Sequence, residues 1–224
     1  MSPAPLAFLR GRSPPRTRTA HLNLIPMGDT HKRSFEIEFH IPTPAGTVTK
    51  QVFPPKLVGA SLEPSFYRPP AHYHIWQDEH FTVMSGEGTW YLWGGKTVHL
   101  KTGDEIVVPA WKWHTFDITP ESKEPLAVAY RYNKEYAEME ERFFRNILSY
   151  FGDCQRAGTK PSIFQIMVFS MHNWMPIALS VPGPEWLDLV VSGVFLVVVG
   201  IIGELLLGYK ASYPEYYVKE KKVE

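Results

Sequence analysis

The sequence has few of the residues that build disulfide-linked, zinc-ribbon or nucleic-acid-binding proteins. It contains a single cysteine, Cys154, so no internal disulfide can form and paired CxxC zinc motifs are excluded. No Asn-x-Ser/Thr glycosylation site occurs. The 23 lysines and arginines cancel the 23 aspartates and glutamates, so no net basic charge favours nucleic acid as a partner. These absences argue against a secreted, oxidised domain and against nucleic-acid binding.

Residues 1–28 have no acidic side chain, four arginines and several prolines. An arginine-rich, acid-free segment is typical of a transit peptide, but the prolines oppose the amphipathic helix that such a peptide needs. The apolar run Leu6–Leu9 is too short for a secretory signal. We therefore expect a flexible arm over 1–28, with a targeting role as the alternative.

Residues 29–132 are expected to form one all-β domain. From Phe35 to Ile41, apolar and polar residues alternate, which is the signature of a half-buried strand. Short runs rich in β-branched and aromatic residues follow, separated by Gly, Asp and Pro turns. These runs predict strands at 80–84, 89–93, 97–100, 105–108 and 126–131. Short strands at such intervals are typical of a small sandwich or barrel.

The hydrophobic period becomes helical within residues 133–156. We expect one amphipathic helix over Lys134–Phe151, ended near Gly152, that covers the barrel. Its apolar side is expected to carry Tyr136, Met139, Phe143 and Leu148. Its solvent side is expected to carry Glu138, Glu140, Glu141 and Arg145.

Residues 157–209 are nearly free of charge and predict a membrane-associated region. As a helix, residues 187–209 would extend roughly 34 Å, which is enough to cross a bilayer core. Trp186 and Tyr209 bracket this segment as interfacial rings would, and Glu204 lies near its end, where a charge costs less. We expect a membrane span at 187–209, with a helix buried in a dimer interface as the alternative. The weaker apolar segment 162–181 predicts an interfacial or re-entrant element, joined to the span by a turn at 182–184.

Residues 210–224 form a lysine-rich tail, and an excess of lysine marks the cytoplasmic face of a membrane protein. Lys221 and Lys222 resemble the dilysine signal that returns membrane proteins to the endoplasmic reticulum, a receptor-read address. The sequence therefore predicts an endoplasmic-reticulum membrane protein whose barrel lies on the cytoplasmic side.

The chemistry is concentrated in four residues on neighbouring predicted strands. His72 and His74 are two residues apart, so on a strand both imidazoles leave the same face. A turn near Gln77 would bring Glu79 back over them, and His114 is placed to join from an adjacent strand. Three imidazoles and one carboxylate suit Fe(II), Mn(II), Ni(II), Cu(II) or Zn(II), with coordination positions left open for substrate. HxH pairs also occur as ordinary polar pairs, and a barrel that keeps the fold without metal is the alternative.

At this point the sequence resembles the cupin superfamily. Its first motif, G(X)5HXH(X)3–4E(X)6G, is matched by His72, His74, Glu79 and Gly86, with Phe66 replacing the first glycine. Its second motif, G(X)5PXG(X)2H(X)3N, is matched at three positions and departs at two. The matching residues are Gly103, Pro109 and His114, and the departures are Trp111 and Ile118. The resemblance implies a single jelly-roll β-barrel holding a metal at the four ligand positions, Fe(II) before the other candidates.

Aromatic residues surround the predicted metal site. Parity places either Tyr91 with Trp93 or Trp90 with Leu92 inside the barrel. The predicted substrate-binding residues are Phe81, Tyr91, Trp93, Trp111 and Phe116. Most aromatic residues in a barrel are core, but as a group around a metal they favour a flat or greasy substrate. His80 and His99 fall outside the pattern and are expected at the surface.

Short single-barrel cupins with a hydrophobic C-terminal tail are similar to oxidoreductases of fungal natural-product clusters, including those that make salicylaldehyde-type polyketides. The resemblance implies a metal-dependent oxidoreductase of secondary-metabolite biosynthesis. A second role for the ligand Glu79, as a general base, is a hypothesis that the sequence does not separate from ligation. A redox-neutral isomerase, cyclase or dehydratase is the second hypothesis. The third is a membrane-tethered binding module without turnover. Cupins often form homodimers by strand exchange, and residues 33–41 are the candidate strand.

Overall fold

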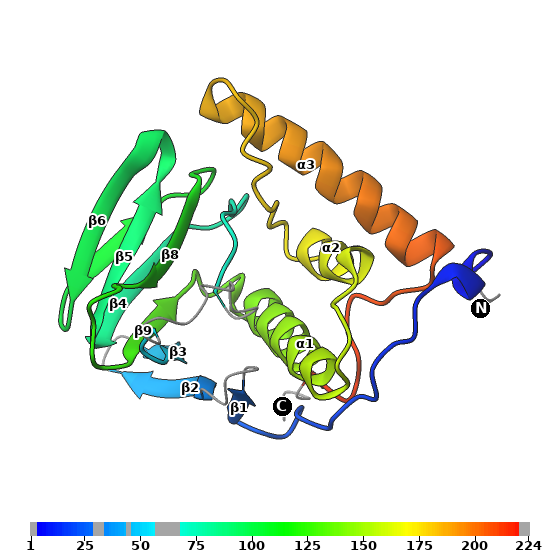
Figure 1. The fold of residues 1–224 in the computed structure, drawn as a ribbon, viewed down its shortest axis with the longest axis horizontal. Helices are drawn as coiled ribbons and strands as arrows, with labels where there is room; N and C mark the ends of the chain where they lie inside the picture. The colour runs from blue at the N-terminus through cyan, green and yellow to red at the C-terminus, as the bar shows by residue number, and fades with distance from the viewer. Residues whose placement is uncertain (1–3, 29–33, 44–45, 57–67, 220–224) are drawn as a thin grey trace.

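The computed structural model describes residues 4–28, 34–43, 46–56 and 68–219, and its core is two antiparallel β-sheets followed by helices (Figure 1). The expected departure of the first motif at Phe66 and the dilysine pair at Lys221 and Lys222 lie outside these residues. The six-stranded sheet runs, in spatial order, β1 (Leu24–Gly28), β2 (Ser34–Thr43), β3 (Gly46–Phe53), β9 (Leu126–Arg131), β4 (Glu79–Ser85) and β7 (Glu105–Val108). The three-stranded sheet runs β6 (Lys96–Lys101), β5 (Glu87–Leu92) and β8 (His114–Ile118).

The expected strands are present. Two strands of the larger sheet, β1 and β3, were not predicted from the sequence. β1 lies inside the segment expected to be a flexible arm, because Leu24–Gly28 pairs with Ser34–Glu38 of β2. Upstream of β1, the chain is also held in place, since Thr19 N–H donates to the Glu215 carbonyl at 2.8 Å. β2 pairs with β1 on one side and with β3 on the other, so in this chain it is not a free edge for strand exchange.

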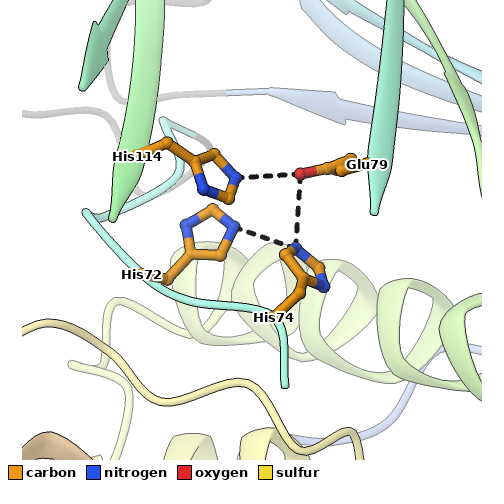
Figure 2. A group of neighbouring side chains, drawn as sticks. All are labelled: His72, His74, Glu79 and His114. Carbon is orange, nitrogen blue, oxygen red and sulfur yellow. Dashed lines mark hydrogen bonds and ion pairs between the residues drawn. The ribbon is translucent and has the colours of Figure 1, made fainter. Parts of the chain in front are cut away.

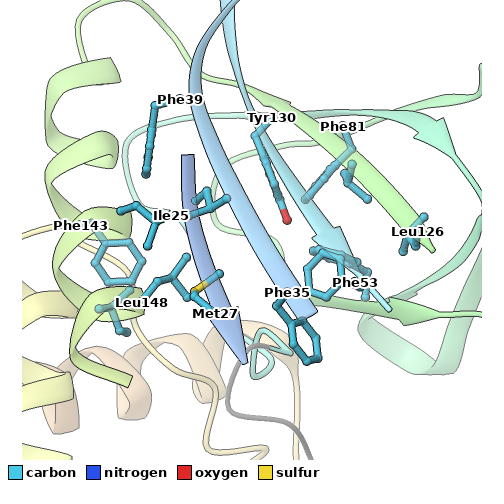
Figure 3. Close-up of a cluster of buried hydrophobic side chains, with 14 of the residues drawn as sticks. Ile25, Met27, Phe35, Phe39, Phe53, Phe81, Leu126, Tyr130, Phe143 and Leu148 are labelled. Atoms are coloured by element: carbon cyan, nitrogen blue, oxygen red, sulfur yellow. The ribbon is translucent and has the colours of Figure 1, made fainter. Parts of the chain in front are cut away.

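The helix after the barrel is α1 (Ala137–Arg156), which covers the larger sheet as expected (Figure 3). Phe143 and Leu148 pack into the same buried cluster as Ile25 and Met27 of β1. The helix continues through Gly152 to Arg156, so its expected end near Gly152 is wrong.

The solvent side expected for α1 is also partly wrong. Glu140 is completely buried and Arg145 is 3% exposed. Arg145 is retained in the interior because its Nη1 donates to the Leu22 carbonyl at 2.7 Å and its guanidinium lies 4.1 Å from the centre of the Phe39 ring.

Two further helices lie beyond α1. α2 (Ile163–Met171) is the regular part of the segment expected to be interfacial or re-entrant, and α3 (Glu185–Ile201) continues as a π-helix over Ile202–Leu206. Residues 182–184 form the expected connection before α3. Figure 1 shows α3 along the outside of the molecule, with α2 between it and α1.

The chain after α3 turns back onto the body of the protein. Tyr209 is only 6% exposed, so its expected role as an interfacial ring is wrong. Tyr213 and Tyr216 are buried against α1, where the Tyr213 N–H donates to Asn146 Oδ1 at 2.9 Å. The described part of the tail, to residue 219, is therefore packed on the same body that holds the barrel.

Candidate metal centre

His72 and His74, separated by one residue, lie on an extended segment that runs beside β8. The His72 N–H donates to the His114 carbonyl at 3.0 Å, and the His114 N–H donates back to the His72 carbonyl at 3.1 Å. The segment forms two isolated bridges, from His72 to His114 and to Ile177, rather than a regular strand, but the predicted alternation of side chains still holds. Tyr73, between the two histidines, points the other way and donates from its hydroxyl to Asp188 Oδ2 of α3 at 2.7 Å.

The structure brings all four predicted ligands together, as Figure 2 shows. One ligand atom from each residue lies within 4.8 Å of the others, and all four side chains are buried. Glu79 Oε2 lies 2.9 Å from His114 Nε2 and 3.3 Å from His74 Nε2. His72 Nε2 lies 3.2 Å from His74 Nε2.

Backbone carbonyls fix which imidazole nitrogen faces the centre of the group. His72 Nδ1 lies 2.8 Å from the Pro70 carbonyl and His114 Nδ1 lies 3.0 Å from the Lys112 carbonyl. A carbonyl accepts only from a protonated nitrogen, so in the neutral rings Nδ1 carries the proton and each Nε2 offers a lone pair. This is the orientation that metal-ligating histidines adopt.

The electrostatics of the four residues favour a charged pair in the metal-free site. Burial opposes charge on Glu79, but the neighbouring His74 and His114 outweigh it and lower the pKa of the Glu79 carboxyl. Burial also opposes charge on His74, yet Glu79 and Glu140 raise the pKa of that imidazole to about 10. The pKa of His72 is lowered well below its usual value by burial and by the two other histidines.

A second carboxylate, Glu140 of α1, supports His74 from behind. Glu140 Oε1 lies 3.6 Å from His74 Nδ1 and accepts hydrogen bonds from Gln77 and, at 3.0 Å, from Asn173 Nδ2. Burial raises the pKa of Glu140. The role of Glu140 is not predictable from the sequence, because a helical glutamate beside two others is usually solvated.

The carboxylate oxygen of Glu79 that does not face the histidines, Oε1, is hydrogen-bonded to Tyr132. The Tyr132 hydroxyl donates to Glu79 Oε1 at 3.3 Å, which leaves Oε2 directed at the histidines. Tyr132 follows directly after β9, and burial and the charge of Glu79 raise its pKa well above the usual value.

Two of the predicted substrate-binding aromatics, Phe81 and Phe116, lie inside the barrel next to the four-residue cluster. The Phe81 ring lies 6.1 Å from the His114 ring and 5.5 Å from the Phe116 ring. Trp90 is the inward residue of β5, fully buried and stacked on Phe116 at 5.1 Å. Of the two alternatives for the inward residues of this strand, Trp90 with Leu92 is therefore correct and Tyr91 with Trp93 is wrong.

The other three predicted aromatics lie elsewhere. Tyr91 and Trp93 line a surface depression of about 460 Å³ together with Trp113 and Val181. Trp111 is 58% exposed, although its indole N–H donates to the Ile75 carbonyl at 2.6 Å. The five aromatics do not form one pocket wall around the four ligands.

The backbone conformation explains the glycine at one motif position, Gly86, and is kept at another, Trp111, where glycine is replaced. Gly86 has a positive φ of 74°, and a Cβ atom there would meet the Pro125 carbonyl oxygen at 2.4 Å. Trp111, which replaces a glycine of the second motif, keeps the glycine-like conformation with a φ of 68°. Its N–H donates to the His74 carbonyl at 2.7 Å, so this turn is tied to the ligand segment.

The donor set fits a divalent first-row transition metal. Three buried imidazole nitrogens and one carboxylate oxygen face a common centre, two of the imidazoles are oriented by backbone carbonyls, and the third is backed by a carboxylate. A two-sheet β fold with such a cluster inside is the architecture of a metal-binding cupin.

Comparison with known proteins agrees with this class. The cupin domain model matches residues 60–129. The probable oxidoreductase virH of Hypocrea virens is 34% identical over 158 residues, covering 66% of this chain and 68% of that protein. The oxidoreductase iacF of Pestalotiopsis fici is 30% identical over 124 residues, covering 50% of this chain and 61% of that protein. The chain thus spans about two thirds of the length of these relatives.

Solved structures are more distant. A cupin-like protein from Thermotoga maritima is 18% identical, covers 52% of this chain and 77% of that chain, and superposes with a TM-score of 0.33. The match to virH is close and long enough to settle the family, and the chain belongs to the cupin family, among relatives named as fungal oxidoreductases.

Proposed function

We propose that the protein is a metal-dependent oxidoreductase that acts on a hydrophobic, polyketide-derived intermediate of secondary metabolism. The observation that carries the proposal is the convergence of His72, His74, Glu79 and His114, with their ligand atoms within 4.8 Å of one another. The oxidoreductase names of virH and iacF support the class of reaction.

Fe(II) is the metal we propose, with Mn(II), Ni(II), Cu(II) and Zn(II) as the other members of the set that these donors accept. When bound, such an ion supplies Lewis acidity and, for Fe(II), one-electron chemistry with dioxygen. The protein positions the donors, and the buried shell around them keeps bulk water from the site.

Glu79 has two roles in this proposal, as a ligand through Oε2 and as a general base toward the substrate. Its Oε1 is held by Tyr132, so the carboxylate has a fixed partner on the side away from the histidines. A base held in this way abstracts a proton only from a group that lies within hydrogen-bond reach of the four-residue cluster.

The substrate class is proposed from the aromatic surroundings. Phe81 lies beside His114 and Phe116 lies beside Phe81, so these two of the five predicted aromatics line the interior next to the cluster. Aromatic walls favour a flat, apolar ligand over a sugar acid or a phosphate.

The experiment that tests the reaction is oxygen uptake by the Fe(II)-loaded full chain with hydrophobic phenolic precursors. We expect substrate-dependent oxygen consumption, lost in His114→Ala and kept in His99→Ala, because His99 is exposed on β6. Product formation without oxygen uptake would establish the redox-neutral alternative. Ligand binding without turnover, unchanged by His114→Ala, would establish the binding module.

We also propose that the protein works at a membrane, at the endoplasmic reticulum with the barrel on the cytoplasmic side. Residues Glu185–Leu206 form one helix of 22 residues, and an 18-residue stretch of it has a mean hydropathy of 2.6, so it is long and apolar enough for a membrane. Membrane association would raise the local concentration of a lipophilic substrate. A homodimer remains part of the proposal on the family resemblance alone.

A further inference from the structure

The helix proposed for the membrane has its polar side turned inward and its apolar side turned outward. Residues spaced along one face of α3 and its π-helical end are exposed by 44–64%. They are Trp186, Val190, Val194, Val198, Ile201 and Leu205. A helix of a protein surrounded by water shows the opposite pattern, so this face requires an apolar partner.

Each of the three acidic side chains of this helix has a hydrogen-bond or ion-pair partner elsewhere in the protein. Glu185 accepts from the Trp113 N–H at 2.9 Å, and Asp188 accepts from the Tyr73 hydroxyl at 2.7 Å. Glu204 Oε2 lies 3.0 Å from His172 Nε2. The outward face therefore carries no charge along its length, and the start of the helix is anchored to the two segments that bear the metal ligands.

Both ends of the helix are attached to the same folded body. At the far end, the Leu6 N–H donates to the Leu206 carbonyl at 2.9 Å, and Arg10 Nη1 donates to the Gly208 carbonyl at 3.1 Å. The chain then packs Tyr213 and Tyr216 into the core. A helix that crosses a bilayer must have its ends on opposite faces, which these contacts do not allow.

We infer that α3 lies in the plane of a membrane, with its outward face in the lipid, and that it does not cross the bilayer. The inference rests on the membrane association of the proposed function, but not on its metal chemistry. Further exposed apolar side chains lie close to the helix in the chain's contacts: Leu179, whose N–H donates to Ser192 Oγ of α3, and Phe8, two residues after the Leu6 N–H that donates to the Leu206 carbonyl. Aromatic and aliphatic side chains of this kind insert into the interfacial layer of a bilayer.

The charges around the face favour anionic lipid over a second copy of this chain. Exposed Lys112 lies at the start of α3, with its Nζ 3.0 Å from Glu185 Oε2. Arg10 and exposed Lys210 lie at the end. Two copies paired in parallel through this face would bring their Arg10 and Lys210 ends together, whereas phosphate head groups of anionic lipids complement these cations.

The first test is flotation of the full chain with vesicles of phosphatidylcholine containing anionic phosphatidylserine. We expect binding to fall by about tenfold or more in Val194→Glu/Val198→Glu, because charges then face the lipid. The matched control is Val107→Glu/Met84→Glu, which places the same charges at exposed apolar positions of β7 and β4 and should bind normally. Metal content should be equal in all three proteins, so failure here is distinct from failure of the metal site.

The second measurement separates the in-plane helix from a span. Fluorophores attached to cysteines introduced at Val190, Val198 and Leu205 report depth, because Cys154 is buried and does not compete for the label. Equal, shallow depths of about 5–10 Å are expected at all three positions. A deep central label between shallow ends in opposite leaflets would overturn the inference, as would a lipid-free dimer broken by Val194→Glu/Val198→Glu with no vesicle binding.

Discussion

At the scale of single residues, Glu140 is the main addition to the predicted site, because it supports the predicted ligand His74. It belongs to α1, whereas the ligands belong to the barrel, so it links the covering helix to His74. The predicted solvent face of α1 is wrong at this position because the segment before β4 and the segment after α2 supply hydrogen-bond donors, Gln77 and Asn173. The helical periodicity of residues 134–151 does not predict these donors, because both come from distant parts of the sequence.

We predict that Glu140→Gln weakens metal binding by about 10–100-fold while the fold is retained, since carboxylates behind a ligating histidine fix its orientation and raise its basicity. The measurement is competition with a chromophoric chelator. The matched control is Glu138→Gln on the same helix, where the carboxylate is 56% exposed and faces Lys219. Equal affinities in the two variants would show that Glu140 does not position His74.

Metal binding should strengthen as the pH rises. With a pKa of about 10, His74 holds a proton in the metal-free protein at neutral pH, and a bound ion must displace it. We predict about one proton released per metal and roughly a tenfold gain in affinity per pH unit below that pKa. Titration calorimetry in buffers of different ionisation enthalpy measures both quantities.

The raised pKa of His74 makes the metal-free protein less stable as the pH rises, whereas metal binding strengthens. A raised histidine pKa stabilises the folded state fully below the ordinary value of 6.5, and the contribution is lost as the pH rises toward 10. An affinity for Zn(II) that is constant between pH 6 and 8, with no proton release, would contradict this protonation state of His74.

At the scale of elements, the packing of α3 depends on glycines that face α2. A Cβ atom at Gly203 would approach the Phe164 carbonyl oxygen and Val168 Cγ2, both at 2.9 Å. A Cβ atom at Gly200 would approach Met171 Sδ at 2.7 Å. The two helices therefore touch where no side chain separates them.

We predict that Gly203→Ala destabilises the protein by about 1–3 kcal/mol, the usual cost of forcing extra volume into a packed contact. Gly193→Ala is the matched control, because nothing lies within 4 Å of its added Cβ atom. That substitution should stabilise the helix by roughly 0.5–1 kcal/mol. Denaturant unfolding in detergent measures both, and equal effects would show that α2 and α3 are not in close contact.

The strands show which elements local patterns determine. β4 to β7 and β9 were predicted because turn residues bound short β-rich runs, and their bounds agree within one or two residues. β1 was missed because five residues with a proline, Leu24–Gly28, carry little signal until β2 is present to pair with them. The end of α1 was missed because Gly152 is tolerated inside a packed helix.

At the scale of the whole molecule, the clustering of the four predicted ligands was predictable but their surroundings were not. Motif spacing places His72, His74, Glu79 and His114 on adjacent segments, and the sheet register then brings them together. The contacts of α3 with the ligand segments, through Asp188 to Tyr73 and Glu185 to Trp113, join residues more than 70 positions apart. No local pattern in the sequence specifies such pairs.

The apolar helix α3, which we propose lies at a membrane, illustrates the same limit. Hydropathy finds the segment, but a span and an in-plane helix have the same composition over residues 187–209. The difference lies in which face is buried and where the ends are attached. Those features depend on the buried tyrosines of the tail and on the N-terminal segment, both distant in sequence from α3.

The central claim is that the four-residue cluster holds a divalent metal, and the direct measurement is the metal content of the full chain purified without chelators. We predict about one transition-metal ion per chain after loading with Fe(II), Mn(II) or Zn(II), since the ligand atoms form one compact site. His114→Ala should lose the ion, and His99→Ala should keep it. A folded protein that takes up none of these metals, or that binds them equally well in His114→Ala, would contradict the account.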